Sequence, residues 1–487
     1  MLINLRVNPR MKQTQVPLCI DLDGTLSRSD SLLETFCELL KVAPLAILQV
    51  PFWLFKGRAN LKREIAERVR LGFKMMPLND AVLNYIQEAK RQGRTLILVT
   101  AADRLVGAAM QERLRLFDEV ITSSGRINLS GGNKVTALVE RFGFKGFDYI
   151  GNSNVDLPVW AAARFSYVVS SNQKLLEKAR TVSSIERVFP SPGPTLKTWL
   201  RALRVHQWAK NLLLLVPLAG AHQWHNHARL ISTLIGMVAF SICASSVYIL
   251  NDLLDLESDR HHPTKRYRSF ASGEISLLHG LLAVPLLLAL SVSLALYLNP
   301  GFAAILAAYY TMTLLYSFWL KQVALLDVLV LAGLYAIRIL AGGYTATVIV
   351  TDWLLLFSIF LFLSLAFAKR FTELHQTRHG ADSGKIKGRG YHHEDVELIS
   401  NMGVCCGYLS VLVLGMYVTH PAVIGLYHTP RVLWLICPVL LYWVSRVWLL
   451  AHRGEMHNDP ILFALKDRSS WIAVAVIVLI AAVAGPQ

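Results

Sequence analysis

Two patterns of hydrophobic and polar positions divide this chain. Up to about residue 200, short apolar runs alternate with polar stretches, as they do in mixed α/β domains. Beyond that point, apolar runs of about 17 to 25 residues follow one another, which is the length of a helix that crosses a bilayer. The pattern predicts an α/β domain followed by an all-helical, multi-pass membrane bundle.

The second part is expected to contain about nine membrane-spanning helices. Their approximate ranges are 207–221, which is short, 230–250, 277–298, 301–320, 324–346, 352–370, 398–418, 431–450 and 469–486. The loops 251–276, 320–323, 369–397 and 451–468 hold roughly fourteen Lys and Arg residues, whereas the other loops hold about two. Positive residues favour the cytoplasmic side, so we expect these loops and the α/β domain there and the C-terminus outside.

Composition and charge support this division. The chain is 54% hydrophobic and 17% charged, which is too apolar for a soluble protein of 487 residues. Its net charge of +16 would suit nucleic acid, but most of the excess lies in loops beside the predicted spans, so no nucleic-acid partner is expected. Residues 1–16 are polar and basic without an apolar core, unlike a signal peptide. The six cysteines show no CxxC spacing and resemble small core residues.

The predicted domain boundaries follow from these patterns. Residues 1–186 form the α/β domain, 187–198 a linker rich in proline, and 199–487 the membrane domain. The apolar run 43–55 is too short and too rich in proline to span a bilayer. A cap helix, or a patch resting on the membrane surface, fits it better.

The segment Asn251–Arg268 has the pattern of a metal site. Asp252, Asp255 and Asp259 are spaced i, i+3, i+7, so a continuous helix would place them on one face. Hard oxygen ligands suit Mg²⁺, which completes its shell with phosphate oxygens of a substrate. We therefore predict Mg²⁺ here and a substrate that carries a diphosphate.

Cations and an amide near the predicted spans are candidates for binding the anionic groups of such a substrate. They are Asn251, Lys265, Arg268, Lys210, Lys321, Arg338, Lys369 and Arg370. For Lys210, Lys321 and Arg338 the sequence leaves snorkelling or structural ion pairing open as an alternative. An acidic helix end whose basic neighbours only set membrane topology is a weaker explanation of the whole segment, because ionisable residues at a membrane boundary are costly and usually functional.

The pattern N-D-x-x-D-x-x-x-D followed by H-P-x-K-x-x-R, at the end of the second predicted span, resembles the UbiA superfamily of intramembrane prenyltransferases. The resemblance covers about residues 200–487. It implies an all-helical bundle whose Asp-rich motif holds Mg²⁺ against the diphosphate of a substrate, with the lipid chain reaching a lateral opening.

Further stretches indicate a branch of that superfamily. The loop after the sixth span begins KRFTEL and lacks the second Asp-rich motif of the aromatic prenyltransferases. The stretches RVHQWAKNLLLLVPLAG and FLFLSLAFAKRFTEL, together with Arg338, resemble the polyprenyl-phosphate phosphoribosyltransferase branch instead. This resemblance implies Mg²⁺-dependent transfer of 5-phosphoribosyl from phosphoribosyl pyrophosphate to a polyprenyl phosphate in a bacterial inner membrane. An aromatic prenyltransferase, or a transporter or lipid-binding protein with a phosphate-sensing domain, remains an alternative.

The first domain carries a second set of motifs. The strand LCIDLDGTL ends in D-x-D-G-T and resembles motif one of the haloacid dehalogenase (HAD) phosphatase superfamily, and LILVT, GGNKVTAL and YIGNSNVD follow in the order of its other motifs. The resemblance implies a helical cap at 27–92 and a second Mg²⁺ site that includes Asp21 and Asp23. It also implies that Asp21 is the nucleophile, Asp23 the acid and base, Thr100 and Lys134 the phosphate anchors, and Asp156 part of the Mg²⁺ site.

One position departs from the HAD pattern. Where the family has an acid directly after the glycine of its fourth motif, this chain has Gly151-Asn152, and an amide oxygen holds Mg²⁺ with less charge. A phosphate-binding or structural relic is the alternative to a working phosphatase. If the domain is active, it could remove the 5′-phosphate of the lipid-linked product at high effective concentration.

Overall fold

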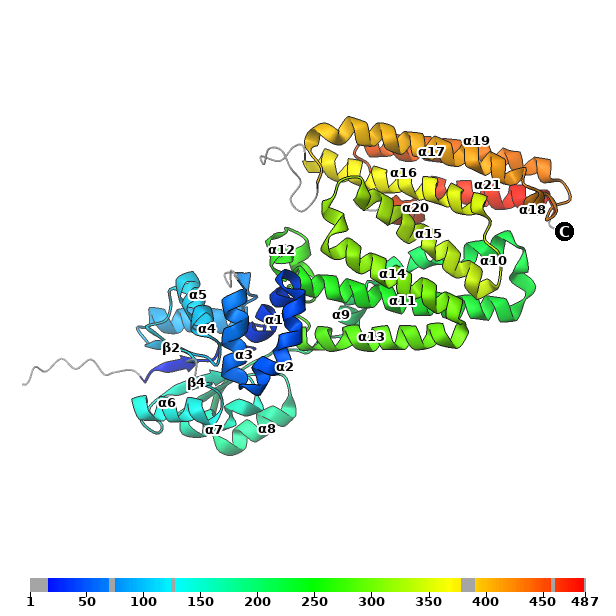
Figure 1. Ribbon diagram of the computed structural model, residues 1–487. Helices are drawn as coiled ribbons and strands as arrows, with labels where there is room; N and C mark the ends of the chain where they lie inside the picture. The colour runs from blue at the N-terminus through cyan, green and yellow to red at the C-terminus, as the bar shows by residue number, and fades with distance from the viewer. Residues whose placement is uncertain (1–15, 70–74, 124–127, 378–389, 457–459, 486–487) are drawn as a thin grey trace, which may run out of the picture. The chain divides into compact units, whose positions relative to one another are not determined.

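The computed structural model describes residues 16–69, 75–123, 128–377, 390–456 and 460–485 (Figure 1). The expectations for the N-terminal residues 1–15 and for the middle of the loop 369–397 lie outside these ranges. Two compact units are present: residues 1–202 together with 249–283, and residues 203–248 together with 284–487. The Asp-rich segment therefore packs in the same unit as the α/β domain, and the domain boundaries predicted along the chain remain a prediction.

A six-stranded, fully parallel sheet forms the centre of the α/β domain, with the strand order β3-β2-β1-β4-β5-β6. The strands are β1 (Leu18–Ile20), β2 (Leu96–Val99), β3 (Glu119–Ile121), β4 (Asp148–Gly151), β5 (Ser166–Val169) and β6 (Ile185–Phe189). In the middle of the sheet, Cys19 lies opposite both Ile97 and Tyr149. Strands buried on both faces need continuous apolar runs, which is how LCI and LILV read in the sequence. The predicted α/β fold is confirmed.

Helices cover both faces of the sheet. On one face α4 (Asp80–Arg91) and α5 (Arg104–Leu114) pack against Leu18 and Ile20, and on the other α6 (Gly132–Phe142), α7 (Leu157–Ala162) and α8 (Gln173–Val182) pack against Cys19. The two sides follow from the alternation of side chains along a strand. Helix α4 lies inside the range 27–92 that the resemblance implies for the cap, but it packs in this layer against the sheet.

The inserted cap is a small helical cluster. It consists of α1 (Ser31–Val42), η1 (Pro44–Gln49), α2 (Val50–Phe55) and α3 (Arg58–Arg68), which share a core that includes Leu39, Trp53 and Ile65. The apolar run 43–55 thus folds into short helices, and it leaves Leu48 and Phe55 81% and 96% exposed. Its expected contact with a membrane surface remains a prediction.

The last strand, β6, extends into the segment 187–198 predicted as a linker. Strand β6 runs to Phe189 because Arg187, Val188 and Phe189 pair with Tyr167, Val168 and Val169 of β5. Irregular chain then leads to α9 (Leu196–Ala202).

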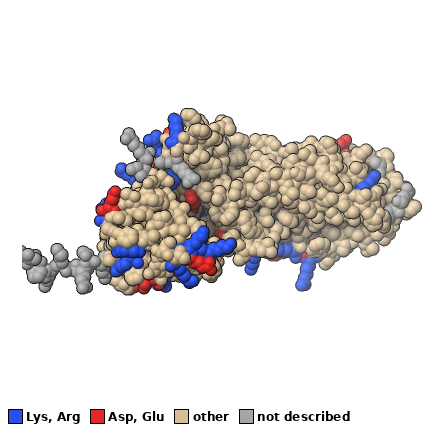
Figure 2. Space-filling model, turned by 90° about the horizontal axis from the view of Figure 1, so that it is seen from below, with Lys and Arg blue, Asp and Glu red and all other residues tan. Residues whose placement is uncertain are grey.

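Seven helices of the described residues are long and apolar enough to cross a membrane. They are α11 (His227–Leu254), α13 (Leu277–Leu298), α14 (Pro300–Phe318), α15 (Leu326–Ala346), α16 (Asp352–Thr377), α17 (Val396–Val418) with the 3₁₀ turn η8 (His393–Asp395) before it, and α19 (Ile436–His452) with the 3₁₀ helix η9 (Pro430–Leu435) before it. On the face shown in Figure 2, charged side chains are sparse over the bundle.

Of the nine expected spans, seven fall on these candidate helices, and the other two fall on shorter apolar elements of the described residues. The predicted first span is the 3₁₀ helix η4 (Val205–Leu215) followed by α10 (Val216–Gly220), and the predicted last span is α21 (Arg468–Val483), which has only 16 residues. The remaining short elements are η3 (Asn154–Asp156), η5 (Gln223–His225), α12 (Leu256–His261), η6 (Lys265–Tyr267), η7 (Leu320–Gln322), α18 (Pro421–Ile424) and α20 (Pro460–Lys466).

Small residues let the helices of the bundle approach closely. A Cβ atom on Gly403 of α17 would lie 2.1 Å from the ring of Trp448 in α19 and 2.8 Å from Phe367 in α16. Close packing at small residues is a general way to hold helices together where lipid removes the hydrophobic driving force.

The contribution of buried ion pairs to the stability of the α/β domain can be tested at Asp148, at the start of β4. Its buried carboxylate accepts hydrogen bonds from Arg94, from Arg164 at 2.8 and 3.0 Å, and from the amide of Phe165. Because Asp148→Asn leaves two guanidinium groups without their counter-charge, we expect it to lower the free energy of opening of β4 by roughly 2 to 4 kcal/mol. Hydrogen exchange of the sheet amides in the full chain measures this quantity.

The matched control is Glu119→Gln, whose partner Arg141 lies 2.7 Å away with both side chains partly exposed. An exposed pair contributes about 1 kcal/mol or less. Equal losses for the two variants would show that burial of Asp148 does not matter.

Candidate active sites

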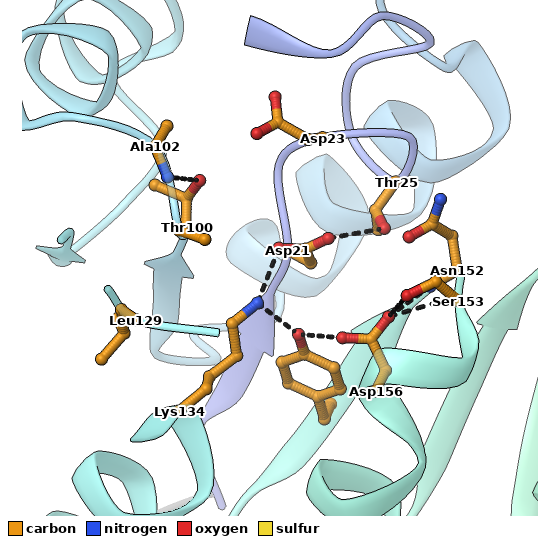
Figure 3. Close-up of polar contacts among 12 residues, drawn as sticks. Asp21, Asp23, Thr25, Thr100, Ala102, Leu129, Lys134, Asn152, Ser153 and Asp156 are labelled. Atoms are coloured by element: carbon orange, nitrogen blue, oxygen red, sulfur yellow. Dashed lines mark hydrogen bonds and ion pairs between the residues drawn. The ribbon is translucent and has the colours of Figure 1, made fainter. Parts of the chain in front are cut away.

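The motif residues of the α/β domain meet at one edge of the sheet. Asp21 and Asp23 follow β1, Thr100 follows β2, and Asn152 follows β4. These three strands are neighbours in a parallel sheet, so their carboxyl ends lie at the same edge, where ligands of α/β domains generally bind. Figure 3 shows the side chains converging there.

Asp21 is the centre of a buried hydrogen-bond network. The ammonium of Lys134 donates to Asp21 Oδ1 at 2.8 Å and to the hydroxyl of Tyr149 at 2.8 Å, and Tyr149 in turn donates to Asp156 Oδ1 at 2.9 Å. Thr25 donates to the other oxygen of Asp21 at 3.2 Å. Burial by itself would lower the pKa of Lys134, but Asp21 and Asp156 raise it above its ordinary value. A permanent positive charge thus lies beside the Asp21 carboxylate.

Asp23 points away from that network (Figure 3). The cap holds its side chain. Its two oxygens accept hydrogen bonds from the backbone and the hydroxyl of Ser31, at 2.9 and 3.0 Å, at the start of α1. Burial raises the pKa of Asp23 to about 7, and the charges of Asp30 and Asp21 add to this effect. A carboxyl group with such a pKa can give or take a proton near neutral pH, which suits the predicted acid and base.

Asp156 supports the loop after β4. Its Oδ2 accepts from the backbone of Asn152 at 3.1 Å and from the backbone and hydroxyl of Ser153 at 3.0 and 3.1 Å. With Tyr149 on the other oxygen, this carboxylate orders the loop through both of its oxygens. Its predicted role in supporting a metal remains a prediction.

Asn152 lies against the turn that follows Asp23. A Cβ atom on Gly24, whose φ is +73°, would come within 2.1 Å of the Asn152 amide nitrogen. Both the left-handed backbone and this contact require glycine at position 24. The turn and the loop after β4 are thereby held together next to Asp21.

Thr100 is fully buried, and its hydroxyl accepts from the backbone of Ala102 at 3.0 Å. It lies at the predicted edge, as Lys134 does. Ser31 and Tyr149 belong to the site although the motifs did not indicate them. The only sequence signal for Ser31 was the helix-start pattern Asp30-Ser31 before an apolar run.

The Asp-rich segment differs from its predicted geometry in one respect. Helix α11 ends at Leu254 and α12 begins at Leu256, so the chain leaves helical geometry at Asp255, whose φ and ψ are −101° and 16°. The three aspartates therefore do not share one continuous helix. The break nevertheless leaves Asp252 and Asp259 close to a common partner.

That partner is Arg268. Its Nη1 donates to Asp252 Oδ1 at 3.1 Å and to Asp259 Oδ2 at 2.7 Å, and both carboxylates are buried. Two buried carboxylates that converge on one cation are a donor set that fits Mg²⁺, which binds through one or two carboxylates and substrate phosphates. Within the described residues no group of three or more His, Cys, Asp and Glu side chains lies together as a metal site, so a metal here would need ligands from the substrate or water.

Two of the predicted phosphate ligands share an aromatic cluster in the second unit. The guanidinium of Arg338, in α15, lies 5.3 Å from the ring of Tyr335, and the ammonium of Lys210 lies 5.7 Å from the same ring. Arg338 also donates to Asn211 at 3.0 Å and to Tyr309 at 3.2 Å. These contacts give the buried Arg338 protein partners, which is the structural alternative that the sequence left open.

Arg370 has a structural environment. It is fully buried, and its three nitrogens donate to Asp327, to Glu373 at 2.5 Å and to Tyr316 at 3.0 Å. Asp327 also accepts from Tyr391 at 2.5 Å. This arrangement favours an ion pair that joins α15 and α16 over the predicted contact with phosphate.

The other predicted ligands lie at or near the ends of helices. Lys265 is exposed in η6, and Asn251, Lys321 and Lys369 are partly buried in α11, η7 and α16. Their predicted contacts with phosphate groups remain predictions.

Comparison with protein families decides the classification of the membrane domain. Residues 212–471 match the UbiA prenyltransferase family. The chain belongs to this family. It is therefore a multi-pass membrane protein of a transferase family, with a second, α/β domain before the matched region.

Several curated proteins are similar to the chain, and two of them illustrate the extent of the match. The uncharacterized protein y4nM of Sinorhizobium fredii is 38% identical over 467 residues, which cover 95% of this chain and 90% of that protein. The decaprenyl-phosphate phosphoribosyltransferase of Mycobacterium tuberculosis is 36% identical over 192 residues, which cover 39% of this chain and 64% of that protein. The first relative shares both domains, and the second aligns with a part of the chain only.

Among solved structures, the apo form of a phosphoserine phosphatase aligns with 36% of this chain and 93% of its own, with 15% identity and a TM-score of 0.27. This likeness is too low to carry an argument about activity. The parallel sheet and the residues at its edge carry the resemblance to HAD phosphatases.

Replacing Arg268 tests the metal position. In Arg268→Gln the carboxylates of Asp252 and Asp259 lose their shared cation, so a divalent ion no longer has to displace it. Without substrate, we expect Mn²⁺ to bind roughly tenfold more tightly than to the wild type. Electron paramagnetic resonance of Mn²⁺ added to the full chain measures the free ion.

Arg266→Gln is the control, because Arg266 is exposed and its guanidinium contacts Tyr267. It removes the same charge two residues away without touching the two carboxylates. Unchanged Mn²⁺ affinity in Arg268→Gln, or an equal change in Arg266→Gln, would contradict a metal position between Asp252 and Asp259.

Proposed function

We propose that this protein transfers 5-phosphoribosyl from phosphoribosyl pyrophosphate to a polyprenyl phosphate, with Mg²⁺, and that its α/β domain removes the 5′-phosphate of the lipid-linked product. The observation that carries the proposal is the pair of buried carboxylates, Asp252 and Asp259, that converge on one cation in a chain of the UbiA family. The partial similarity to a decaprenyl-phosphate phosphoribosyltransferase supports the choice of donor and acceptor.

In the transfer step, the bond between the anomeric carbon and the diphosphate breaks, and an oxygen of the lipid phosphate forms the new bond to that carbon. A bound Mg²⁺ would neutralise the charge that develops on the departing diphosphate. Arg268, released from the two carboxylates, is free to bind the same group, and Lys265 follows in the same segment. A phosphate monoester is already anionic near neutral pH, so the acceptor needs no general base.

Transfer leaves the 5′-phosphate of ribose on the lipid-linked sugar. In the α/β domain, Asp21 attacks this phosphorus and Asp23 protonates the departing sugar oxygen. Lys134 balances the negative charge, and Asp23 then takes a proton from the water that hydrolyses the aspartyl phosphate. The raised pKa of Asp23 and the permanent charge on Lys134 support these roles.

We further propose that both sites face the cytoplasm at a bacterial inner membrane. The distribution of Lys and Arg between the loops supports this orientation. A second Mg²⁺, bound near Asp21, fits the family resemblance. Asn152, in place of an acid, would hold it with less charge.

The order of the two reactions can be tested by their products. Full-length protein in detergent is incubated with Mg²⁺, a polyprenyl phosphate and phosphoribosyl pyrophosphate, and the lipids are analysed by mass spectrometry. The wild type should give the dephosphorylated ribosyl lipid, Asp21→Asn the 5-phosphoribosyl lipid, and Asp252→Asn neither. If no sample forms a sugar lipid, prenyl transfer from a polyprenyl diphosphate donor becomes the better assignment.

The acid and base role of Asp23 has a separate test. Hydrolysis of the aspartyl phosphate needs a general base whatever the leaving group, and removing such a base typically costs 10²- to 10⁴-fold in rate, so Asp23→Asn should lower kcat for p-nitrophenyl phosphate by about two orders of magnitude or more at pH 7. The exposed Asp80→Asn serves as the control, since Asp80 lies 3.5 Å from Arg28 at the surface. An equal kcat for Asp23→Asn and Asp80→Asn would remove Asp23 from the mechanism.

A further inference from the structure

An ion pair within the first compact unit joins the two sets of candidate catalytic residues. Arg260 follows Asp259 in α12, and Glu34 lies in α1 of the cap. The Nη1 and Nη2 atoms of Arg260 donate to the two carboxylate oxygens of Glu34 at 2.8 and 2.6 Å. Its Nε donates to the backbone oxygen of Ala271 at 3.0 Å. Glu34 and Arg260 are 3% and 8% exposed.

The position of this pair in the chain is unusual. Its residues are 226 positions apart. Arg260 lies within the part that matches the UbiA family, whereas Glu34 lies in the α/β domain. Burying two charges is costly, and the attraction between them often does no more than offset this cost. Paired hydrogen bonds between a guanidinium and a carboxylate do, however, fix the relative orientation of the two groups.

On one side the pair leads to Asp23. Glu34 is three residues after Ser31, so the two side chains are neighbours on one face of α1. Ser31 donates two hydrogen bonds to Asp23. A shift of α1 at Glu34 therefore moves the group that holds the candidate acid and base.

On the other side the pair leads to the Asp-rich segment. Arg260 is the neighbour of Asp259 in the chain, and Asp259 shares Arg268 with Asp252. A shift of α12 at Arg260 therefore moves one of the two carboxylates of the candidate metal position.

A second contact supports the same arrangement. Gly273, with a φ of +74°, packs so closely that a Cβ atom there would lie 2.8 Å from Arg28 and 3.2 Å from Pro77. Arg28 and Pro77 are the residues where the chain leaves and re-enters the α/β core around the cap, and Arg28 donates its amide to Pro77. The segment after α12 thus contacts the base of the cap, and α12 itself contacts Glu34.

We propose that Glu34 and Arg260 are positioning residues that couple the two active sites, so that a ligand on the Asp-rich segment changes turnover at Asp21 and Asp23. The inference rests on the proposed function, since it takes the two sites to be a transferase and a phosphatase. Coupling of this kind is reciprocal for binding. Binding of diphosphate at the Asp-rich segment would thereby change the activity at Asp21 and Asp23, the site that acts on the phosphoribosyl lipid.

The contact itself is tested without reference to activity. Hydrogen exchange is measured on the full chain in lipid nanodiscs for the wild type and for Glu34→Gln, which leaves Arg260 without its counter-charge. We expect exchange to speed up by roughly tenfold or more in both residues 31–39 and residues 256–275. Glu64→Gln, which breaks an ion pair of the same cap with Arg68 at 2.6 Å, is the control and should change neither segment. Faster exchange in only one of the segments, or in none, overturns the proposal.

Coupling is tested by adding pyrophosphate with Mg²⁺ as the probe of the Asp-rich segment. In the wild type it should change kcat or KM for p-nitrophenyl phosphate by about fivefold or more, and in Glu34→Gln this change should disappear. The double variant Glu34→Arg with Arg260→Glu restores an ion pair and should restore part of the effect. A wild type without the effect, or an effect that persists in Glu34→Gln, overturns coupling.

The failure of the proposed function would look different. If the wild type does not hydrolyse p-nitrophenyl phosphate at all, the phosphatase assignment fails. Coupling is then read from hydrogen exchange of residues 31–39 when Mg²⁺ and pyrophosphate are added. Slower exchange in the wild type but not in Glu34→Gln supports coupling, and unchanged exchange in the wild type overturns it.

Discussion

Pairing of buried charge is the constraint on which both candidate sites depend. An isolated buried charge costs several kcal/mol, so a carboxylate away from water needs a cation or several hydrogen-bond donors. Lys134 meets this need for Asp21, and Arg268 meets it for Asp252 and Asp259. In both places the cation lies where an anionic substrate or a metal would act. The cations that neutralise the buried carboxylates in the folded chain are thus also the groups that a ligand would contact.

The same constraint distinguishes two kinds of environment among the cations predicted to bind phosphate. Arg370 is balanced by Asp327 and Glu373 and has no nitrogen left without a protein partner, whereas Arg268 is shared between two carboxylates through a single nitrogen. A divalent ion can take the place of Arg268 at little cost, because the two carboxylates keep a positive partner. If Arg370 turned to a phosphate instead, Asp327 would lose its positive partner in the bundle. The difference between the two arginines follows from their partners and not from residue type.

Local patterns predicted much of the fold and of the site. The apolar runs at Leu18–Ile20 and Leu96–Val99 predicted buried parallel strands, and the residues after them meet at one edge because parallel strands end there. The structure departs from the predicted elements where packing decides the outcome. Helix α4 joins the sheet layer, helix α11 ends before Asp255, and the run 207–221 folds into the 3₁₀ helix η4 followed by α10. The Glu34–Arg260 contact could not be predicted, since no local spacing relates residues so far apart in the chain.

The pairing of Glu34 with Arg260 also changes how the fusion of two domains can be understood. A tether alone raises the effective concentration of the second site, but it does so for any product released nearby and does not set the order of events. The Glu34–Arg260 ion pair lies between Asp259 and Ser31. It can therefore make the site at Asp21 and Asp23 respond to a ligand at the Asp-rich segment. If the proposed function holds, the intermediate is a lipid confined to the membrane surface, and the bilayer already keeps it near both sites. Coordination between the sites is therefore the advantage that a buried, costly ion pair can add to the fusion.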